Sequence, residues 1–213
     1  MRGNENVSAN SFIGNIPNLI TVGRLFAVPL LVWLILNDAM EAAFWVFVAA
    51  GVSDALDGFI AKRFNLVTKL GGYLDPIADK ALLVSTFVTL GQSDHVGTWL
   101  VILVVFRDVL IIGGTILFHT LGRAVEMRPL LISKFNTLMQ IILVSVLLAT
   151  LGIDMPDYGL IPFLVILVGA TTVLSGLAYM VHWVLDVQIA LQWPGRPRAD
   201  QGATDRKPAG DRI

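Results

Sequence analysis

Apolar blocks, each about 20 residues long, recur along the chain and are separated by short polar segments. A helix of about 20 apolar residues is long enough to cross the hydrocarbon core of a membrane. The pattern predicts six membrane-spanning helices, at residues 17–37, 42–61, 76–92, 98–119, 134–152 and 160–186. Short connections favour a single bundle of neighbouring antiparallel helices. We therefore expect an all-α integral membrane protein.

The six blocks define one central domain, residues 15–190, with a segment on each side. Residues 1–14 lack the apolar core of a cleavable signal peptide, so the first helix is expected to remain attached. Residues 191–213 are rich in Pro, Gly and charged residues, a composition that predicts a disordered tail. No internal repeat is evident in the sequence.

Composition agrees with the membrane assignment. Of the 213 residues, 55% are hydrophobic and only 15% are charged, whereas a soluble domain usually carries about 25% charged residues. The absence of cysteine excludes disulfides, thiolate nucleophiles and Cys-ligated metals. We expect no nucleic-acid partner.

The charged residues between the blocks alternate in sign. The connections at 38–41, 93–97 and 153–159 contain acidic residues and neither Lys nor Arg, whereas those at 62–69 and 120–134 are basic. The C-terminal tail is also rich in basic residues. Because cytoplasmic connections carry an excess of Lys and Arg, both termini and both basic connections are predicted to face the cytoplasm.

Four aspartates interrupt the apolar pattern at one predicted depth. Asp54 and Asp57 lie three residues apart in the cytoplasmic half of the second helix, and Asp75 and Asp79 lie four apart where the third begins. Each spacing puts two carboxylates on one helical face. Two carboxylates 4 Å apart repel by about 4 kcal/mol at an effective dielectric constant of 20. Such a cluster must either take up protons or bind cations.

An all-oxygen cluster without His or Cys is typical of sites for hard divalent ions, Mg²⁺ or Mn²⁺. Two such ions could clamp the groups of an in-line displacement at phosphorus. Small residues at Gly58, Ala61 and Gly71 leave room for a ligand to approach the backbone. Lys62, with Arg63 beside it, offers cationic donors at the membrane surface.

Structural explanations exist for individual members of the cluster. Asp75 precedes Pro76 and could cap the third helix. Asp57 could form an ion pair with Lys80 or Arg107, and the small residues could simply allow two helices to pack closely. None of these explanations accounts for all four acids at one depth.

The segment "DALDGFIAKRFNLVTKLGGYLDPIAD" resembles the CDP-alcohol phosphotransferase signature, D-x2-D-G-x2-A-R-x8-G-x3-D-x3-D. All spacings are kept, and the one departure is Lys62 where the family has Arg. Lys keeps the charge but lacks the bidentate guanidinium fork. The stretch "NIPNLITVGR" is similar to the opening of the family's first helix, with the pattern P-N-x2-T-x2-R on Pro17, Asn18, Thr21 and Arg24.

The resemblance implies a phosphotransferase that binds two Mg²⁺ or Mn²⁺ ions and releases CMP from CDP-diacylglycerol. It implies that the metal ligands are Asp54, Asp57, Asp75 and Asp79, and that Asp79 is also the general base. It further implies nucleotide contacts from Gly58, Ala61, Lys62, Gly71, Asn18 and Thr21. Family members are commonly dimers, so a homodimer is expected.

Three further stretches, at 106–112, 127–144 and 171–183, are similar to the CMP-forming cardiolipin synthase branch of the family. This branch implies phosphatidylglycerol as acceptor, and the alternative is the branch that uses glycerol 3-phosphate. The residues expected to bind the acceptor or its phosphate are Arg107, Arg128, Ser133 and Lys134. Two of these residues have structural alternatives: Arg107 could pair with Asp108, and Ser133 could cap the fifth helix.

The expected location is a bacterial inner membrane, with the active site near the cytoplasmic face. A protein of another class, a divalent cation transporter, could also place acids in a six-helix bundle. The lack of an internal repeat and the gathering of all four acids at one interface argue against a transporter.

Overall fold

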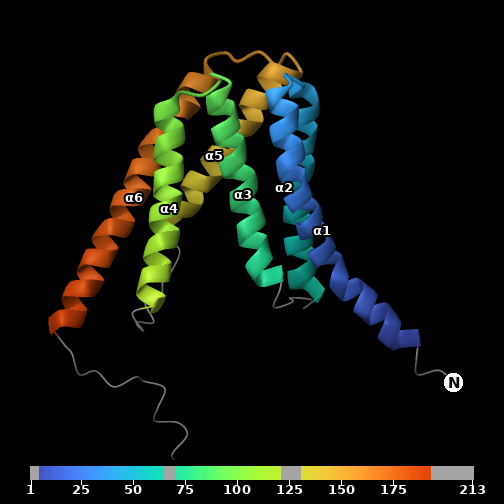
Figure 1. Ribbon diagram of the computed structural model, residues 1–213, viewed down its shortest axis with the longest axis horizontal. Coiled ribbons are helices and arrows are strands. Elements are labelled where there is room, and N and C mark those ends of the chain that lie inside the picture. Colours follow the sequence, from blue (N-terminus) through green and yellow to red (C-terminus); the bar gives the residue numbers. More distant parts are fainter. Residues whose placement is uncertain (1–4, 65–70, 121–130, 193–213) are drawn as a thin grey trace, which may run out of the picture.

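The computed structural model describes the backbone of residues 5–64, 71–120 and 131–192, and the side chains of residues 20–56, 77–117, 120 and 131–184. Within these ranges the chain forms six helices and no strand. The helices are α1 (Glu5–Leu36), α2 (Met40–Phe64), α3 (Gly71–Gln92), α4 (Thr98–Thr120), α5 (Leu131–Gly152) and α6 (Leu160–Gln192). They run up and down in chain order (Figure 1), so the predicted all-α bundle is confirmed.

Two helices begin earlier than the apolar pattern predicts. α1 begins at Glu5 and so includes polar residues ahead of the predicted span. α3 begins at Gly71, which places Asp75 inside the helix. The interpretation of Asp75 as the N-cap of this helix is therefore wrong. The predicted disordered tail falls almost entirely on residues 193–213, outside the described residues.

The α1–α2, α3–α4 and α5–α6 connections lie together at one end of the bundle, the upper end in Figure 1. Asp38 and Asp94 follow α1 and α3 with φ of 56° and 59°, a left-handed conformation that Asp tolerates better than most residues. Hydrogen bonds from the next amide, Ala39 N to Leu34 O at 3.0 Å in the first case, complete a Schellman-type helix end. Acidic residues at this end therefore also terminate helices.

One apolar core joins the helices. It includes the fully buried side chains of Leu31, Ile35, Phe87, Leu100 and Leu148, which come from α1, α3, α4 and α5. α1 packs against α2 and α3, whereas α5 packs against α2 and α6. This core holds α1, α2, α3 and α5 together around the polar residues discussed below.

The outer surface of the bundle is apolar. Large side chains such as Phe26, Phe106 and Ile166 are exposed by 73%, 63% and 69%. Three helical segments are long and apolar enough to cross a membrane, namely Thr98–Leu117, Leu131–Gly152 and Leu160–Val184. α1 contributes the shorter apolar stretch Ile20–Leu36. The chain is thus a helical membrane protein, and three of the six predicted spans meet the length and hydropathy criteria among the described residues.

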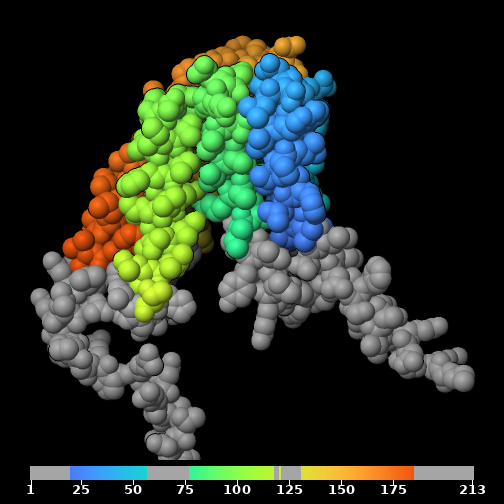
Figure 2. All heavy atoms as spheres, in the orientation of Figure 1, coloured from blue at the N-terminus to red at the C-terminus, as the bar shows by residue number. Residues whose placement is uncertain are grey.

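The bundle is tightest at the end with the acidic connections. Toward the opposite end, a hollow separates α3 from α4 in the space-filling view (Figure 2). The aspartates of α2 and α3 belong to this wider part of the bundle, since they lie far along α2 and early in α3.

Gly152, at the end of α5, tests the close packing at the acidic end. A Cβ at this position would lie 2.6 Å from backbone atoms of Met40 and Glu41, which cannot move without shifting α2. Gly152→Ala should therefore lower the free energy of unfolding by about 1–3 kcal/mol, measured by thermal unfolding in detergent. Gly113→Ala is the matched control, because nothing lies within 4 Å of its Cβ position. Equal stability of the two variants would contradict the packing described here.

Candidate active site

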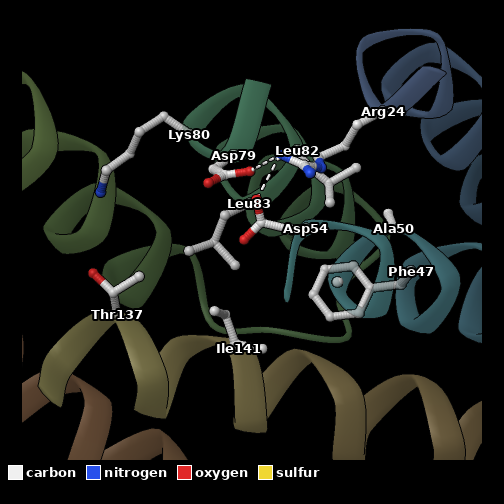
Figure 3. Close-up of a pocket in the computed structure, with 11 residues that line it drawn as sticks. Arg24, Phe47, Ala50, Asp54, Asp79, Lys80, Leu82, Leu83, Thr137 and Ile141 are labelled. Atoms are coloured by element: carbon white, nitrogen blue, oxygen red, sulfur yellow. Dashed lines mark hydrogen bonds and ion pairs between the residues drawn. The ribbon is translucent and has the colours of Figure 1, made fainter. Parts of the chain in front are cut away.

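A pocket of about 270 Å³ lies among α1, α2, α3 and α5. Its charged lining residues are Arg24, Asp54, Asp79 and Lys80 (Figure 3). The apolar and neutral lining residues are Phe47, Ala50, Gly51, Leu82, Leu83, Thr137 and Ile141. The pocket therefore combines an apolar wall with a few converging charges, as ligand sites commonly do.

Arg24 joins the two halves of the aspartate motif. Its Nη1 lies 2.9 Å from Oδ1 of Asp54 on α2 and 2.5 Å from Oδ1 of Asp79 on α3. The Arg24 side chain is only 1% exposed, whereas the two carboxylates are 44% and 45% exposed. The carboxylates thus remain accessible from the pocket while a buried guanidinium offsets their mutual repulsion.

The spacing of the first-helix pattern explains how Arg24 reaches this place. Thr21 and Arg24 lie three residues apart on α1, so both project from one face of the helix. They are 2% and 3% exposed, so this polar face points into the bundle. Arg24 therefore does not extend to the membrane surface as an isolated interfacial charge would.

The donor set is suited to a divalent metal ion. Oxygens of Asp54 and Asp79 both lie within ion-pair distance of one guanidinium nitrogen, so carboxylates from the two halves of the motif are close together. Carboxylate oxygens are the ligands that Mg²⁺ and Mn²⁺ prefer. Among the residues whose side chains are described, no group of three or more acidic, His or Cys residues gathers. The side chains of Asp57 and Asp75 lie outside that part of the chain.

A second buried charge network adjoins the pocket. Asp108 of α4 accepts a hydrogen bond from Nζ of Lys80 at 2.8 Å and another from Nη1 of Arg107 at 2.7 Å. Arg107 also donates to the hydroxyls of Ser175, at 2.8 Å from Nη2, and of Ser133. Arg107 and Asp108 are each 3% exposed. The network links α3, α4, α5 and α6, with Arg107, Asp108 and Ser175 buried and Lys80 partly exposed.

The structure tests the two structural alternatives given above for Arg107 and Ser133. The ion pair between Arg107 and Asp108 is confirmed. Lys80 also forms an ion pair with Asp108, so the Asp108 carboxylate pairs with both Lys80 and Arg107. The interpretation of Ser133 as the cap of the fifth helix is wrong, because α5 begins at Leu131 and Ser133 lies inside it, where its hydroxyl accepts a hydrogen bond from Arg107.

The other predicted site residues divide into those the structure describes and those it does not. Lys134 is exposed near the start of α5, and Thr21 is buried in α1. The remaining predicted positions have side chains outside the described residues: Asn18, Asp57, Gly58, Ala61, Lys62, Gly71, Asp75 and Arg128. The structure therefore brings together Asp54 and Asp79, one from each half of the motif.

Two polar features were not predicted from the sequence. Lys80 lines the pocket, and its position immediately after Asp79 was the signal that could have indicated this. Asn136 is fully buried on α5, where its Oδ1 accepts hydrogen bonds from Thr171 at 2.7 Å and Thr172 at 3.0 Å. Hydroxyl–amide contacts of this kind hold helices together in membranes.

A protein-family model matches residues 14–193, and its description is "CDP-alcohol phosphatidyltransferase". This chain belongs to the CDP-alcohol phosphatidyltransferase family. The match includes all four aspartates of the motif and the first-helix pattern that contains Arg24. The pocket described above is therefore formed by residues from the part of the chain that defines the family.

Named relatives fall into two groups. A chloroplastic CDP-diacylglycerol–glycerol-3-phosphate 3-phosphatidyltransferase 1 of Oryza sativa is 33% identical, over 79% of this chain and 57% of the relative. A CMP-forming cardiolipin synthase of Rattus norvegicus is 32% identical, over 82% of this chain and 63% of the relative. In these two comparisons the chain spans less than two thirds of the relative's length.

A third relative is similar to this chain in length. It is a CDP-diacylglycerol–glycerol-3-phosphate 3-phosphatidyltransferase of Aquifex aeolicus, 31% identical over 80% of this chain and 92% of the relative. Identities of 31% to 33% to proteins with two different names do not separate one acceptor from the other.

The charge network predicts an order of stabilities. Asp108→Asn leaves the guanidinium of Arg107 buried without its anion and should cost about 3–5 kcal/mol. Lys80→Met should cost less than about 1 kcal/mol, because Lys80 is partly exposed and Asp108 keeps Arg107. Unfolding in detergent micelles, followed by circular dichroism, measures both. A larger loss in Lys80→Met than in Asp108→Asn would contradict the arrangement.

Proposed function

We propose that this protein is a metal-dependent transferase that moves a phosphatidyl group from CDP-diacylglycerol to an alcohol and releases CMP. The observation that carries the proposal is the convergence of Asp54 and Asp79, from the two halves of the family motif, on one partly exposed pocket. Membership in the family supports the same reaction class.

In this reaction, the acceptor's hydroxyl oxygen forms a bond to the β-phosphorus of CDP-diacylglycerol. The bond from that phosphorus to the oxygen of CMP breaks, and CMP leaves. Asp79 takes the proton from the acceptor's hydroxyl, a role supported by its carboxylate being 45% exposed in the pocket. Arg24 holds the Asp54 and Asp79 carboxylates in fixed positions through its contacts with both.

Asp54 and Asp79 would hold the metal ions together with Asp57 and Asp75. Bound Mg²⁺ or Mn²⁺ supplies neutralisation of the charge on the diphosphate oxygens. Gly58, Ala61, Lys62, Gly71, Asn18 and Thr21 are the proposed nucleotide contacts. Lys62 provides a positive charge near the donor without the bidentate geometry of Arg.

Phosphatidylglycerol is the proposed acceptor and cardiolipin the proposed product. Support comes from the cardiolipin synthase-like stretches and from the relative in Rattus norvegicus that carries this name. Glycerol 3-phosphate is the alternative acceptor, favoured by the names of the Oryza sativa and Aquifex aeolicus relatives. Both acceptors carry a phosphate, for which Arg128 and Lys134 remain proposed contacts.

We propose that the protein resides in a bacterial inner membrane as a homodimer, with the pocket near the cytoplasmic face. The orientation is supported by the acidic connections at the far end of the bundle. A cytoplasmic pocket suits a donor made from CTP.

The reaction class and the acceptor can be tested in one assay. Purified protein is incubated with CDP-diacylglycerol and Mn²⁺ or Mg²⁺, and each tube receives phosphatidylglycerol, glycerol 3-phosphate, serine or inositol phosphate. We expect CMP and cardiolipin from the phosphatidylglycerol tube alone. CMP only with glycerol 3-phosphate would keep the mechanism and change the acceptor. Uptake of labelled Mn²⁺ into vesicles without CMP release in any tube would favour a transporter.

The role of Asp79 can be tested with a matched pair of variants. Asp79→Asn should lower kcat by about 10²–10⁴-fold, the usual contribution of a general base. Asp94→Asn makes the same chemical change at an exposed position beyond the end of α3. It should retain wild-type activity, because Asn also tolerates the φ of 59° found there. An active Asp79→Asn enzyme would exclude Asp79 as the base.

A further inference from the structure

The charges of the pocket are arranged along its length. Arg24 lies at one end with its guanidinium directed at Asp54 and Asp79, and Lys80 extends from α3 in the opposite direction, toward the side where Thr137 lies (Figure 3). Adjacent residues on a helix point about 100° apart, which separates the ammonium of Lys80 from the carboxylate of Asp79. The pocket therefore has a carboxylate region and a separate cationic end.

Among the described side chains, one carboxylate pairs with two cations at this end of the pocket. Asp108 is shared between Lys80 and Arg107, so the three groups together carry one excess positive charge. Arg107 is 3% exposed, whereas the Lys80 side chain is 34% exposed and lines the pocket. Asp108 accepts a hydrogen bond from one of the three N–H groups of the Lys80 ammonium. A ligand in the pocket can reach Lys80 but not Arg107.

The same end of the pocket is bordered by the cationic start of α5. Thr137 and Ile141 line the pocket from α5, and Lys134 lies one turn before Thr137, three residues away on the same face. Lys134 is exposed. The hydroxyl of Thr137 donates to the Ser133 carbonyl at 3.2 Å, so among the described residues that line this end Lys80 has the side-chain donor that a ligand can use.

The two proposed acceptors share one geometric requirement. In phosphatidylglycerol and in glycerol 3-phosphate, the attacking hydroxyl and the phosphate lie at opposite ends of a single glycerol unit. An enzyme that holds the hydroxyl at a general base therefore needs an anion-binding group about one glycerol length away. The carboxylate of Asp79 and the ammonium of Lys80 come from consecutive residues that point apart within one pocket.

We propose that Lys80 binds the phosphate of the acceptor, at the end of the pocket bordered by Thr137. This inference rests on the proposed function, since it takes Asp79 as the base and a phosphate-bearing alcohol as the acceptor. It assigns the acceptor's phosphate to a side chain on α3, and it leaves Arg107 as the buried ion-pair partner of Asp108 behind Lys80.

Steady-state kinetics of Lys80→Met and Lys80→Arg test the proposal. A charge-assisted hydrogen bond lost in Lys80→Met should raise KM for the phosphate-bearing acceptor by about tenfold to a hundredfold. The KM for CDP-diacylglycerol should change by less than about twofold, and Lys80→Arg should stay close to wild type. If Lys80→Met does not fold, Lys80→Gln replaces it.

Three results would overturn the proposal. A rise in KM for CDP-diacylglycerol instead of the acceptor would assign Lys80 to the donor's diphosphate. A fall in kcat with both KM values unchanged would give Lys80 a role in the chemical step or in structure. Unchanged kinetics would remove Lys80 from the site.

A binding measurement keeps this test independent of turnover. Glycerol 3-phosphate, or phosphatidylglycerol in detergent micelles, should raise the thermal unfolding midpoint of the wild type and of Lys80→Arg. It should not raise that of Lys80→Met. Equal protection of Lys80→Met, or no protection of the wild type by either compound, would overturn the inference. Protection that depends on Lys80 in a protein that releases no CMP would instead reject the proposed reaction and retain the phosphate site.

Discussion

The fold depends on neutralising aspartates inside a membrane bundle. Asp54 and Asp79 lie on two different helices, and their like charges repel each other. Arg24 of α1 contacts both carboxylates, so one buried guanidinium ties three helices together. Because the carboxylates stay about half exposed while Arg24 is buried, the bundle is held together without closing the pocket. The same contact places one oxygen of each carboxylate beside a single guanidinium nitrogen.

A second neutralised cluster lies beside the first, and the two have different exposures. Arg107 and Asp108 are neighbours on α4 and almost completely buried, and their contacts with Lys80, Ser133 and Ser175 connect α4 to three other helices. Lys80 connects this pair to the pocket, because it contacts Asp108 and also lines the cavity next to Asp79. The interior of the bundle is therefore polar along the part of α3 that contains Asp79 and Lys80. Its lipid-facing surface is apolar, with residues such as Phe26 and Phe106.

The helices and the family could be predicted from the sequence alone, for physical reasons. Apolar blocks of membrane-spanning length leave little freedom in secondary structure, so the six helices were predicted with shifts mainly at polar ends such as Glu5 and Gly71. The aspartate motif is local and its spacing could be read directly. The pairing of Arg24 with Asp79 joins residues 55 positions apart, and that of Lys80 with Asp108 joins residues 28 apart. Neither spacing follows from helical periodicity, so these contacts required the three-dimensional structure.

The proposed reaction requires that the carboxylates facing this pocket bind divalent ions. Titration of the purified protein with Mn²⁺, followed by electron paramagnetic resonance of the free ion, measures this directly and requires no substrate turnover. We expect saturable binding by the wild type and by Asp94→Asn, and a marked loss of binding in Asp54→Asn and Asp79→Asn. Binding that is absent from the folded wild type, or that is equal in all four proteins, would contradict the claim.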